Sequence, residues 1–296
     1  MKKFLIFGFF ILNLTIAFSK DTNFYNLEFW KKLEKVDYPI VFIHGIGGGF
    51  KNWDIAATLV SNENYYEMRY LDGKGLFHNY FPENQNKSKK PWVWNVSYYT
   101  MNPLKESIEG DLTTYAKRLE EIIEKIKLIT GKEKVVLIAH SMGGLVARKY
   151  MTLNDKNWDS VYKILTVGTP NIGVSTSVPI VGQLRDLGMN NSFQKDMNKV
   201  WYSKDYKKKW GVVGGVETKL WINYKNNKFA TDLAGIGYVE IRSSIPNGEW
   251  KEAVRELNRA KYNTKNYGFR IAVSDNHMGL LYNKGTLEGI VWAIKK

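Results

Sequence analysis

Uninterrupted apolar runs recur along the chain, and most end in glycine or in a short polar motif. Continuous rather than alternating apolar strands are typical of parallel sheets buried on both faces. Apolar positions between 108 and 129 instead recur in steps of three and four, which predicts an amphipathic helix between Pro103 and Gly131. The order of these segments predicts an α/β fold with a mostly parallel central sheet and helices on both faces. The predicted core strands are 38–43, 92–99, 135–139, 160–167, 210–216 and 268–273.

The run 135–139 changes character abruptly at His140 and Ser141. A glycine pair and a helical apolar pattern follow at once, so the chain must reverse direction sharply at Ser141. A side chain at such a strand–helix corner projects beyond the end of the sheet, and small residues two positions before and after it relieve the crowding. This is the mechanics of the G-x-S-x-G nucleophile elbow. Here Ala139 replaces the first glycine and Gly143 is the second; alanine is still small.

Other segments have weaker patterns. A polar, helix-like lead-in covers 23–36, and a helix is predicted at 286–294. Residues 65–100 form an aromatic and polar insertion that contains the strand at 92–99. Residues 174–209 lack strong periodicity, and we interpret them as a lid or cap inserted at the carboxyl end of the sheet. An ordinary pair of peripheral helices is the alternative.

The amino terminus has the pattern of a secretory signal peptide. Lys2 and Lys3 precede an apolar run at 4–16, and Ala17 and Ser19 are small residues at a cleavage site. The run is shorter than the ~20 residues that span a bilayer, although a membrane anchor is the alternative. We therefore expect a signal peptide at 1–19, a catalytic domain at 20–296, and a secreted or periplasmic bacterial protein.

The composition limits the partners. The 296 residues contain no cysteine, so neither a disulfide nor a lipoprotein anchor is possible. Lysine and arginine exceed aspartate and glutamate by 43 − 29 = 14, which favours a lipid interface or an anionic envelope surface, or is simply a solvated basic surface. No nucleic-acid motif accompanies the charge, so no nucleic-acid partner is expected. The glycine-rich loop 45–49 lacks the Gly-Lys-Ser/Thr ending of a phosphate loop, and we expect no cofactor and no metal.

Four segments together resemble the α/β-hydrolase superfamily, in particular bacterial lipases and esterases of the triacylglycerol lipase type. They occur in that family's order within 38–296, and some bacterial lipases carry the same alanine before the elbow. The resemblance implies the α/β-hydrolase fold and a serine hydrolase that cleaves carboxylic esters of lipids through an acyl-enzyme. The matching segments are 43–48, 139–148, 167–173 and 276–281.

Ser141 is the predicted nucleophile, and a serine hydroxyl needs a base within hydrogen-bond reach. His277 follows the last apolar strand, in the Ser–acid–His order of this fold. Of the other histidines, His140 precedes Ser141 within its own strand and points to the other side, so packing or a hydrogen bond is its expected part. The resemblance gives His44 a structural part in the oxyanion loop. His78 lies upstream of the elbow, in the wrong order.

The acid of the triad is less well defined. The resemblance leads one to expect Asp-Gly-x-Val after a Ser or Gly, but the corresponding stretch 231–240 has Ile236 at the aspartate position. We assign Asp232, four residues earlier, with Glu240 as the alternative. Asp275 is two residues from His277 and is expected on the loop surface. The remaining candidates are Asp186, Asp205 and Glu217.

An oxyanion hole needs two backbone N–H donors directed at the developing negative oxygen. Met142, directly after the nucleophile, supplies one by its position. Ile46, in the loop after the first strand, is the expected second donor. The elbow does not distinguish a lipase from a carboxylesterase, phospholipase, amidase or acyltransferase. A non-catalytic exported binding protein on a hydrolase scaffold is the alternative outside the enzyme class.

Overall fold

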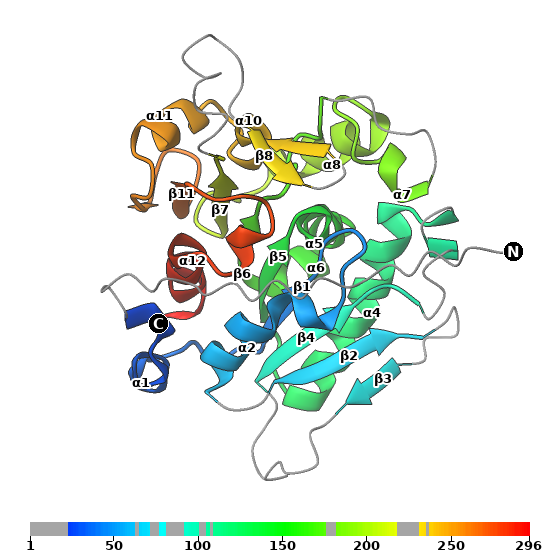
Figure 1. Cartoon of the computed structure of the whole chain (residues 1–296). Coiled ribbons are helices and arrows are strands. Elements are labelled where there is room, and N and C mark those ends of the chain that lie inside the picture. The colour runs from blue at the N-terminus through cyan, green and yellow to red at the C-terminus, as the bar shows by residue number, and fades with distance from the viewer. Residues whose placement is uncertain are drawn as a thin grey trace, which may run out of the picture.

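A nine-stranded sheet runs through the molecule in the order β10-β11-β7-β6-β5-β1-β4-β2-β3 (Figure 1). The computed structural model describes residues 23–62, 65–71, 77–80, 92–100, 105–106, 109–175, 182–217, 231–234 and 237–296, with the backbone alone at 77–80, 231–234 and 237–238. The predicted signal peptide and its membrane-anchor alternative lie outside the described residues, as do residues 72–76 and 81–91 of the predicted aromatic insertion.

The strands from β11 to β2 are all parallel, and only the edge strands β10 and β3 are antiparallel to their neighbours. This confirms the predicted mostly parallel sheet and every predicted core strand. Because the carboxyl ends of parallel strands meet at one edge, the loops after β1, β5, β6, β7 and β11 gather there. The strand bounds are β1 Ile40–Ile43, β2 Tyr66–Tyr70, β3 Phe77–Tyr80, β4 Val93–Ser97, β5 Val135–His140, β6 Val161–Val167, β7 Trp210–Gly215, β10 Lys261–Tyr262 and β11 Phe269–Val273.

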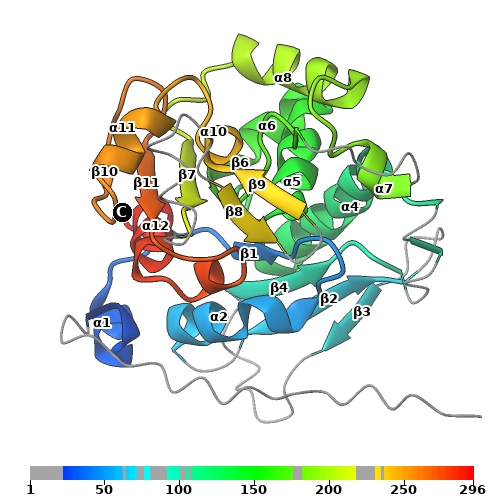
Figure 2. The same ribbon diagram turned by 45° about the horizontal axis from the view of Figure 1, so that its top comes forward.

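Helices cover both faces of this sheet, as predicted (Figures 1 and 2). One apolar cluster joins the sheet to α4, α5, α6, α8, α10 and α11, and a second joins the opposite face to α1, α2 and α12. The first helix lies beside the carboxyl terminus, where Val36 N–H donates to the Ile294 carbonyl at 2.7 Å. The helix bounds are α1 Leu27–Lys32, α2 Asp54–Ser61, α4 Leu112–Thr130, α5 Met142–Thr152, α6 Asp155–Asp159, α7 Gly182–Arg185, α8 Ser192–Ser203, α10 Ile241–Ser244, α11 Trp250–Arg255 and α12 Lys284–Ile294.

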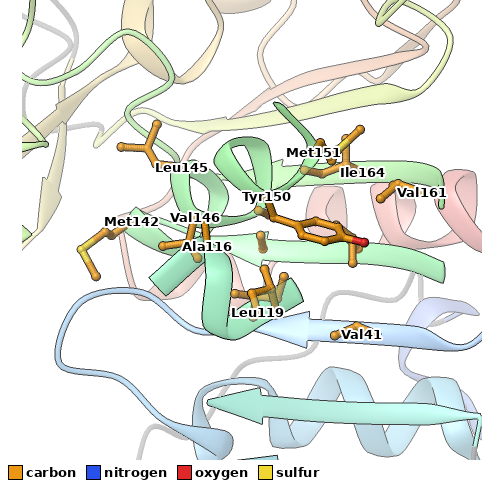
Figure 3. Close-up of a cluster of buried hydrophobic side chains, with 14 of the residues drawn as sticks. Val41, Ala116, Leu119, Met142, Leu145, Val146, Tyr150, Met151, Val161 and Ile164 are labelled. Carbon is orange, nitrogen blue, oxygen red and sulfur yellow. The ribbon is translucent and has the colours of Figure 1, made fainter. Parts of the chain in front are cut away.

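The elbow helix α5 is enclosed on almost every side. Figure 3 shows Leu145 and Val146 of α5 gathered with Ala116 and Leu119 of α4 and with Val41 of β1. Of the apolar stripe predicted between 108 and 129, the positions from Leu112 to Ile126 are buried along α4, Ile129 is partly buried, and residue 108 lies outside the described residues. Helix α5 is therefore a core element, which fixes the position of its first residue relative to the strand before it.

Two sequence predictions of helix bounds are corrected. The long helix does not continue from Pro103: it begins at Leu112, because the Asp111 side chain accepts the Thr114 N–H at 2.8 Å and caps it. The lead-in is helical only over α1, with a short 3-10 turn at Asn23–Tyr25 before it. Helix α2 and strand β2 were not predicted.

The segment 174–209 contains α7 and α8, and its residues 176–181 lie outside the described part of the chain. Helix α8 packs on α5 through the buried side chains Met197 and Trp201. The lid or cap remains a prediction. Strands β8 (Thr231–Ala234) and β9 (Gly237–Glu240) form a separate antiparallel hairpin (Figure 2). The hairpin does not pair with the main sheet, but it contacts β7 of that sheet.

Candidate active site

Ser141 occupies a strained corner between β5 and α5. Its φ of 54° lies in the left-handed region, which costs a residue with a side chain roughly 1–3 kcal/mol. The surrounding structure holds it there: Ser141 N–H donates to the Val167 carbonyl at 2.8 Å. A Cβ at Gly143 would overlap the His44 carbonyl oxygen, so the small residue after the corner is required. The sharp reversal predicted at Ser141 is confirmed.

His277 lies in the loop that follows β11, and its side chain is buried. Its imidazole centroid is 4.5 Å from that of His140, the residue directly before Ser141. Gly168, which directly follows β6, lies against the same side chain: a Cβ added to this glycine would be 3.2 Å from His277 Nδ1. The structure thus brings His277 to the ends of β5 and β6, where the elbow is.

The predicted oxyanion loop closes against the elbow. Gly48 N–H donates to the Gly45 carbonyl at 3.2 Å, and Gly47 has a φ of 63°, which favours glycine. A Cβ on Gly45 would be only 2.8 Å from the Ser141 Cβ, so the loop and the nucleophile are neighbours. Within the described part of the chain, neither Ile46 N–H nor Met142 N–H has a hydrogen-bond acceptor. Their role as the two oxyanion donors stays a prediction.

His44 stabilises this loop as a neutral side chain. Its Nδ1–H donates to the Gly45 carbonyl at 2.7 Å, and Ser97 Oγ–H donates to Nε2 at 3.1 Å. Tyr98 stacks on the imidazole at 4.4 Å and donates its hydroxyl to the His44 carbonyl at 3.0 Å. Burial lowers the pKa of His44 to about 4, so it is uncharged at neutral pH. The structural part expected for His44 fits these contacts.

Of the candidates for the triad acid, Glu240 and Asp186 are bound to other groups, and Asp205 is exposed to solvent. Glu240 is buried, forms an ion pair with Arg242 and accepts a hydrogen bond from Ser175. Asp186 accepts the Leu112 N–H at 3.0 Å, so it is occupied at the start of α4. Asp205 is exposed on the loop after α8. These environments leave two candidates.

Asp232 lies in β8, opposite Val239 of β9, and its side chain is outside the described residues. Glu217 directly follows the β7 region, and its Oε2 is buried without a hydrogen-bond partner in the described residues. Val216 N–H donates to the Val273 carbonyl at 2.8 Å, which ties this point to the strand that leads into the His277 loop. A buried carboxylate oxygen requires a partner. The sequence signal for Glu217 was an acid placed directly after a core strand.

The remaining predicted positions are also located. Asp275 accepts a hydrogen bond from the Asn283 side chain at 2.9 Å, so it belongs to its own loop, as expected. His78 is in β3, the edge strand, far along the sheet from β5.

In the described ranges, no group of three histidine, cysteine, aspartate or glutamate residues is arranged to hold a metal ion. None of the helices described is both long and apolar enough for a membrane span.

Comparison with known proteins gives a family match and distant relatives. The model of the PGAP1-like alpha/beta domain matches residues 35–249. GPI inositol-deacylase of Candida albicans is 30% identical over 137 residues, covering 45% of this chain and 31% of that protein. Triacylglycerol lipase 2 of Saccharomyces cerevisiae is 25% identical over 180 residues, covering 53% of each. The chain thus matches about half or less of the length of these relatives.

A solved structure from Listeria innocua, described only as a gene product, has a TM-score of 0.53 at 16% identity and covers 86% of this chain and 93% of its own. This likeness supports the α/β-hydrolase fold that the strand order and the elbow show. The family match covers strands β1 to β7 of the sheet, the elbow, the oxyanion loop and β8–β9, and it ends before β10, β11 and His277. The chain belongs to the PGAP1-like α/β domain family and has the α/β-hydrolase fold.

Proposed function

We propose that this chain is a serine hydrolase that cleaves carboxylic esters of lipids through an acyl-enzyme on Ser141. The observation that carries the proposal is the convergence of three features: a strained Ser141, the His277 imidazole and two N–H groups without acceptors. The names of the relatives, an inositol-deacylase and a triacylglycerol lipase, support an acylated lipid as the substrate class.

In the proposed acylation step, Ser141 Oγ attacks the ester carbonyl carbon and its proton moves to the neutral His277 imidazole. The N–H groups of Ile46 and Met142 donate to the resulting oxyanion, and each such donor contributes about 2.7–4 kcal/mol of transition-state stabilisation. The C–O bond to the alcohol then breaks, and the His277 imidazolium returns the proton to the leaving oxygen. The products are the free alcohol and the acyl-Ser141 ester.

Deacylation repeats the sequence with water. His277 accepts a proton from the water as its oxygen attacks the acyl carbon, and the same two N–H groups bind the oxyanion. Collapse releases the carboxylic acid and returns the proton to Ser141 Oγ. The acid partner of His277 remains Asp232 in this proposal, and Glu217 is the alternative that its buried, unpartnered oxygen supports.

Hydrolysis of p-nitrophenyl esters of increasing chain length, below and above their solubility limit, tests the substrate class. The proposal predicts activity that rises on long chains and on emulsions and that is lost in Ser141→Ala. A preference for acetyl or butyryl esters without a rise on emulsions would favour a carboxylesterase. Parallel assays on phospholipids, on amides and with an added alcohol acceptor test the phospholipase, amidase and acyltransferase alternatives.

Export is part of the same proposal, and the charged and apolar pattern of residues 1–19 supports it. Expression of the full chain in a bacterium should yield protein outside the cytoplasm that begins at Lys20. Mass spectrometry of the amino-terminal peptide checks this. Retention of Met1 in the mature protein, with the chain bound to membranes, would support the anchor alternative instead.

A further inference from the structure

The side chain of His140 is fixed on several sides at the end of β5. The Trp53 ring is nearly perpendicular to its ring, at 6.3 Å between centroids and 88°, and the His277 ring lies 4.5 Å away. A Cβ on Gly45 would be 3.3 Å from His140 Nδ1, so glycine is needed to leave room for the ring. The ring is therefore held in one orientation.

In this orientation, the His140 ring forms a hydrogen bond with the backbone of the loop that carries His277. His140 Nε2 lies 3.0 Å from the backbone carbonyl oxygen of His277, 137 residues away in the chain. A carbonyl oxygen only accepts, so Nε2 carries the hydrogen and His140 is the donor. Burial lowers the pKa of His140 well below its usual value, so the donor is neutral. A neutral neighbour does not repel the charge that forms on His277 during catalysis.

The loop that carries His277 is held by local hydrogen bonds and by the buried side chains of Leu280 and Leu281 that follow it. Asn276 Oδ1 accepts the Met278 and Gly279 N–H groups at 3.1 and 2.9 Å, and Asp275 binds Asn283 within the following turn. These hydrogen bonds shape the loop, and the buried Leu280 packs beside Gly168 at the end of β6. The hydrogen bond from His140 ties this loop to the elbow itself, because it starts one residue before the nucleophile.

We propose that His140 is a positioning residue that holds the His277 base in register with Ser141. The proposal rests on the proposed serine hydrolase function. A misplacement of about 1 Å in a catalytic group can reduce the rate ~100-fold, so loss of this contact has a measurable consequence. His140 does not transfer a proton in this account: it acts through His277.

A double-mutant cycle tests this role. His140→Phe keeps a ring and removes the donor, and it should lower kcat by about 10- to 100-fold with KM changed by less than about threefold. In a His277→Ala background, the same substitution should change the residual rate by less than about threefold, because the group it positions is absent. His140→Gln, which restores an N–H donor, should recover part of kcat. An equal loss in both backgrounds, or no loss in the wild-type background, would overturn the proposal.

Tyr150→Phe is the matched control, since it removes a buried hydroxyl that is 2.6 Å from Ser160 Oγ, on the far side of α5. Its kcat should stay within about threefold of the wild type. Amide hydrogen exchange of 274–281 gives a readout that needs no activity: exchange should accelerate in His140→Phe and slow again in His140→Gln. If exchange in His140→Phe is unchanged, the positioning role is wrong even if Ser141 reacts normally. If exchange is faster but the wild-type protein is unreactive, the positioning role is supported and only the proposed hydrolase function is rejected.

Discussion

At the residue scale, the oxyanion loop and the elbow approach each other so closely that one methyl group is too large between them. The Cβ that alanine would add at Gly45 meets the Ser141 Cβ at 2.8 Å and the His140 carbonyl oxygen at 3.3 Å. Gly49, four residues along the same loop, has open space at its Cβ and an extended φ of −168°. The two glycines therefore form a matched pair for mutation.

We expect Gly45→Ala to lower kcat/KM by about tenfold or more, because the loop and Ser141 must move apart by a few tenths of an ångström. Gly49→Ala should leave kcat/KM within about threefold of the wild type. Ester hydrolysis by both purified variants, with folding checked by circular dichroism, measures the difference. Equal activity of the two variants would show that the close contact does not set the site geometry.

The acid of the triad is settled by comparing Asp232→Asn, Glu217→Gln and Glu240→Gln. Loss of a triad acid lowers kcat by up to ~10⁴-fold, because the base is no longer oriented and its charged form is no longer stabilised. The proposal expects that loss in Asp232→Asn. The Glu240 variant should retain most activity, since its carboxylate already pairs with Arg242. A large loss in Glu217→Gln with an active Asp232→Asn would move the assignment to Glu217.

The residue types of the site could be predicted from the sequence, but several of their contacts could not. Ser141, Ile46 and Met142 follow from the local elbow and loop patterns. The hydrogen bond between His140 and the His277 loop joins positions 137 residues apart, so no local pattern encodes it. The triad acid is harder still to predict, because several carboxylates follow the core strands in the sequence and only their structural environments distinguish one from another.

At the element scale, helix α8 is joined to the elbow helix by a buried arginine. The Arg148 guanidinium lies 4.4 Å from the Trp201 ring and 4.7 Å from the Trp210 ring. Its Nη2 donates to Asn198 Oδ1 of α8 at 2.7 Å, and its Nη1 donates to the Asn171 carbonyl at 2.8 Å. One side chain thus connects α5, α8 and the loop after β6.

Trp201→Ala should lower the free energy of unfolding by about 3–5 kcal/mol, because it leaves a cavity and removes one of the rings that stack on Arg148. Val200→Ala is the control: Val200 is on the same helix and 37% exposed, so about 0.5 kcal/mol or less is expected. Urea unfolding measures both. A loss below about 1 kcal/mol in Trp201→Ala would show that α8 contributes little to the folded core, as a mobile lid would.

Elements differed in how well the sequence predicted them. Strands β1, β5, β6, β7 and β11 are continuous apolar runs, so burial on both faces marks each of them clearly. Strand β2 alternates buried and partly buried side chains over only five residues, which is too short a pattern to stand out. The start of α4 was misplaced, since the pattern of apolar positions does not reveal the cap at Asp111.

At the scale of the whole molecule, the two buried histidines make stability depend on pH. The unfolded chain binds a proton at His44 near its ordinary pKa of 6.5, whereas the folded chain binds it near about 4. Between these values the unfolded chain binds more protons, so stability falls as the pH is lowered. His140 has the same direction of shift.

Lowering the pH from 6.5 to about 5 should reduce the free energy of unfolding by about 1.6 kcal/mol through His44, because the slope approaches 1.36 kcal/mol per pH unit only below the unfolded pKa. The carboxylates titrate mainly at the lower end of this window and below it, and they are the same in the wild type and in the variant. Urea titrations at several pH values should give a smaller slope for His44→Gln, which has no titrating group. An identical slope in the variant would contradict the assignment of a neutral, buried His44.

The central claim, that Ser141 is a nucleophile activated by His277, is tested most directly by covalent labelling with a fluorophosphonate. The account predicts a stable adduct that mass spectrometry locates on Ser141, absent in Ser141→Ala and formed at least about 100-fold more slowly in His277→Ala. Labelling of the wild type that persists in Ser141→Ala, or no labelling of a correctly folded wild type, would contradict it.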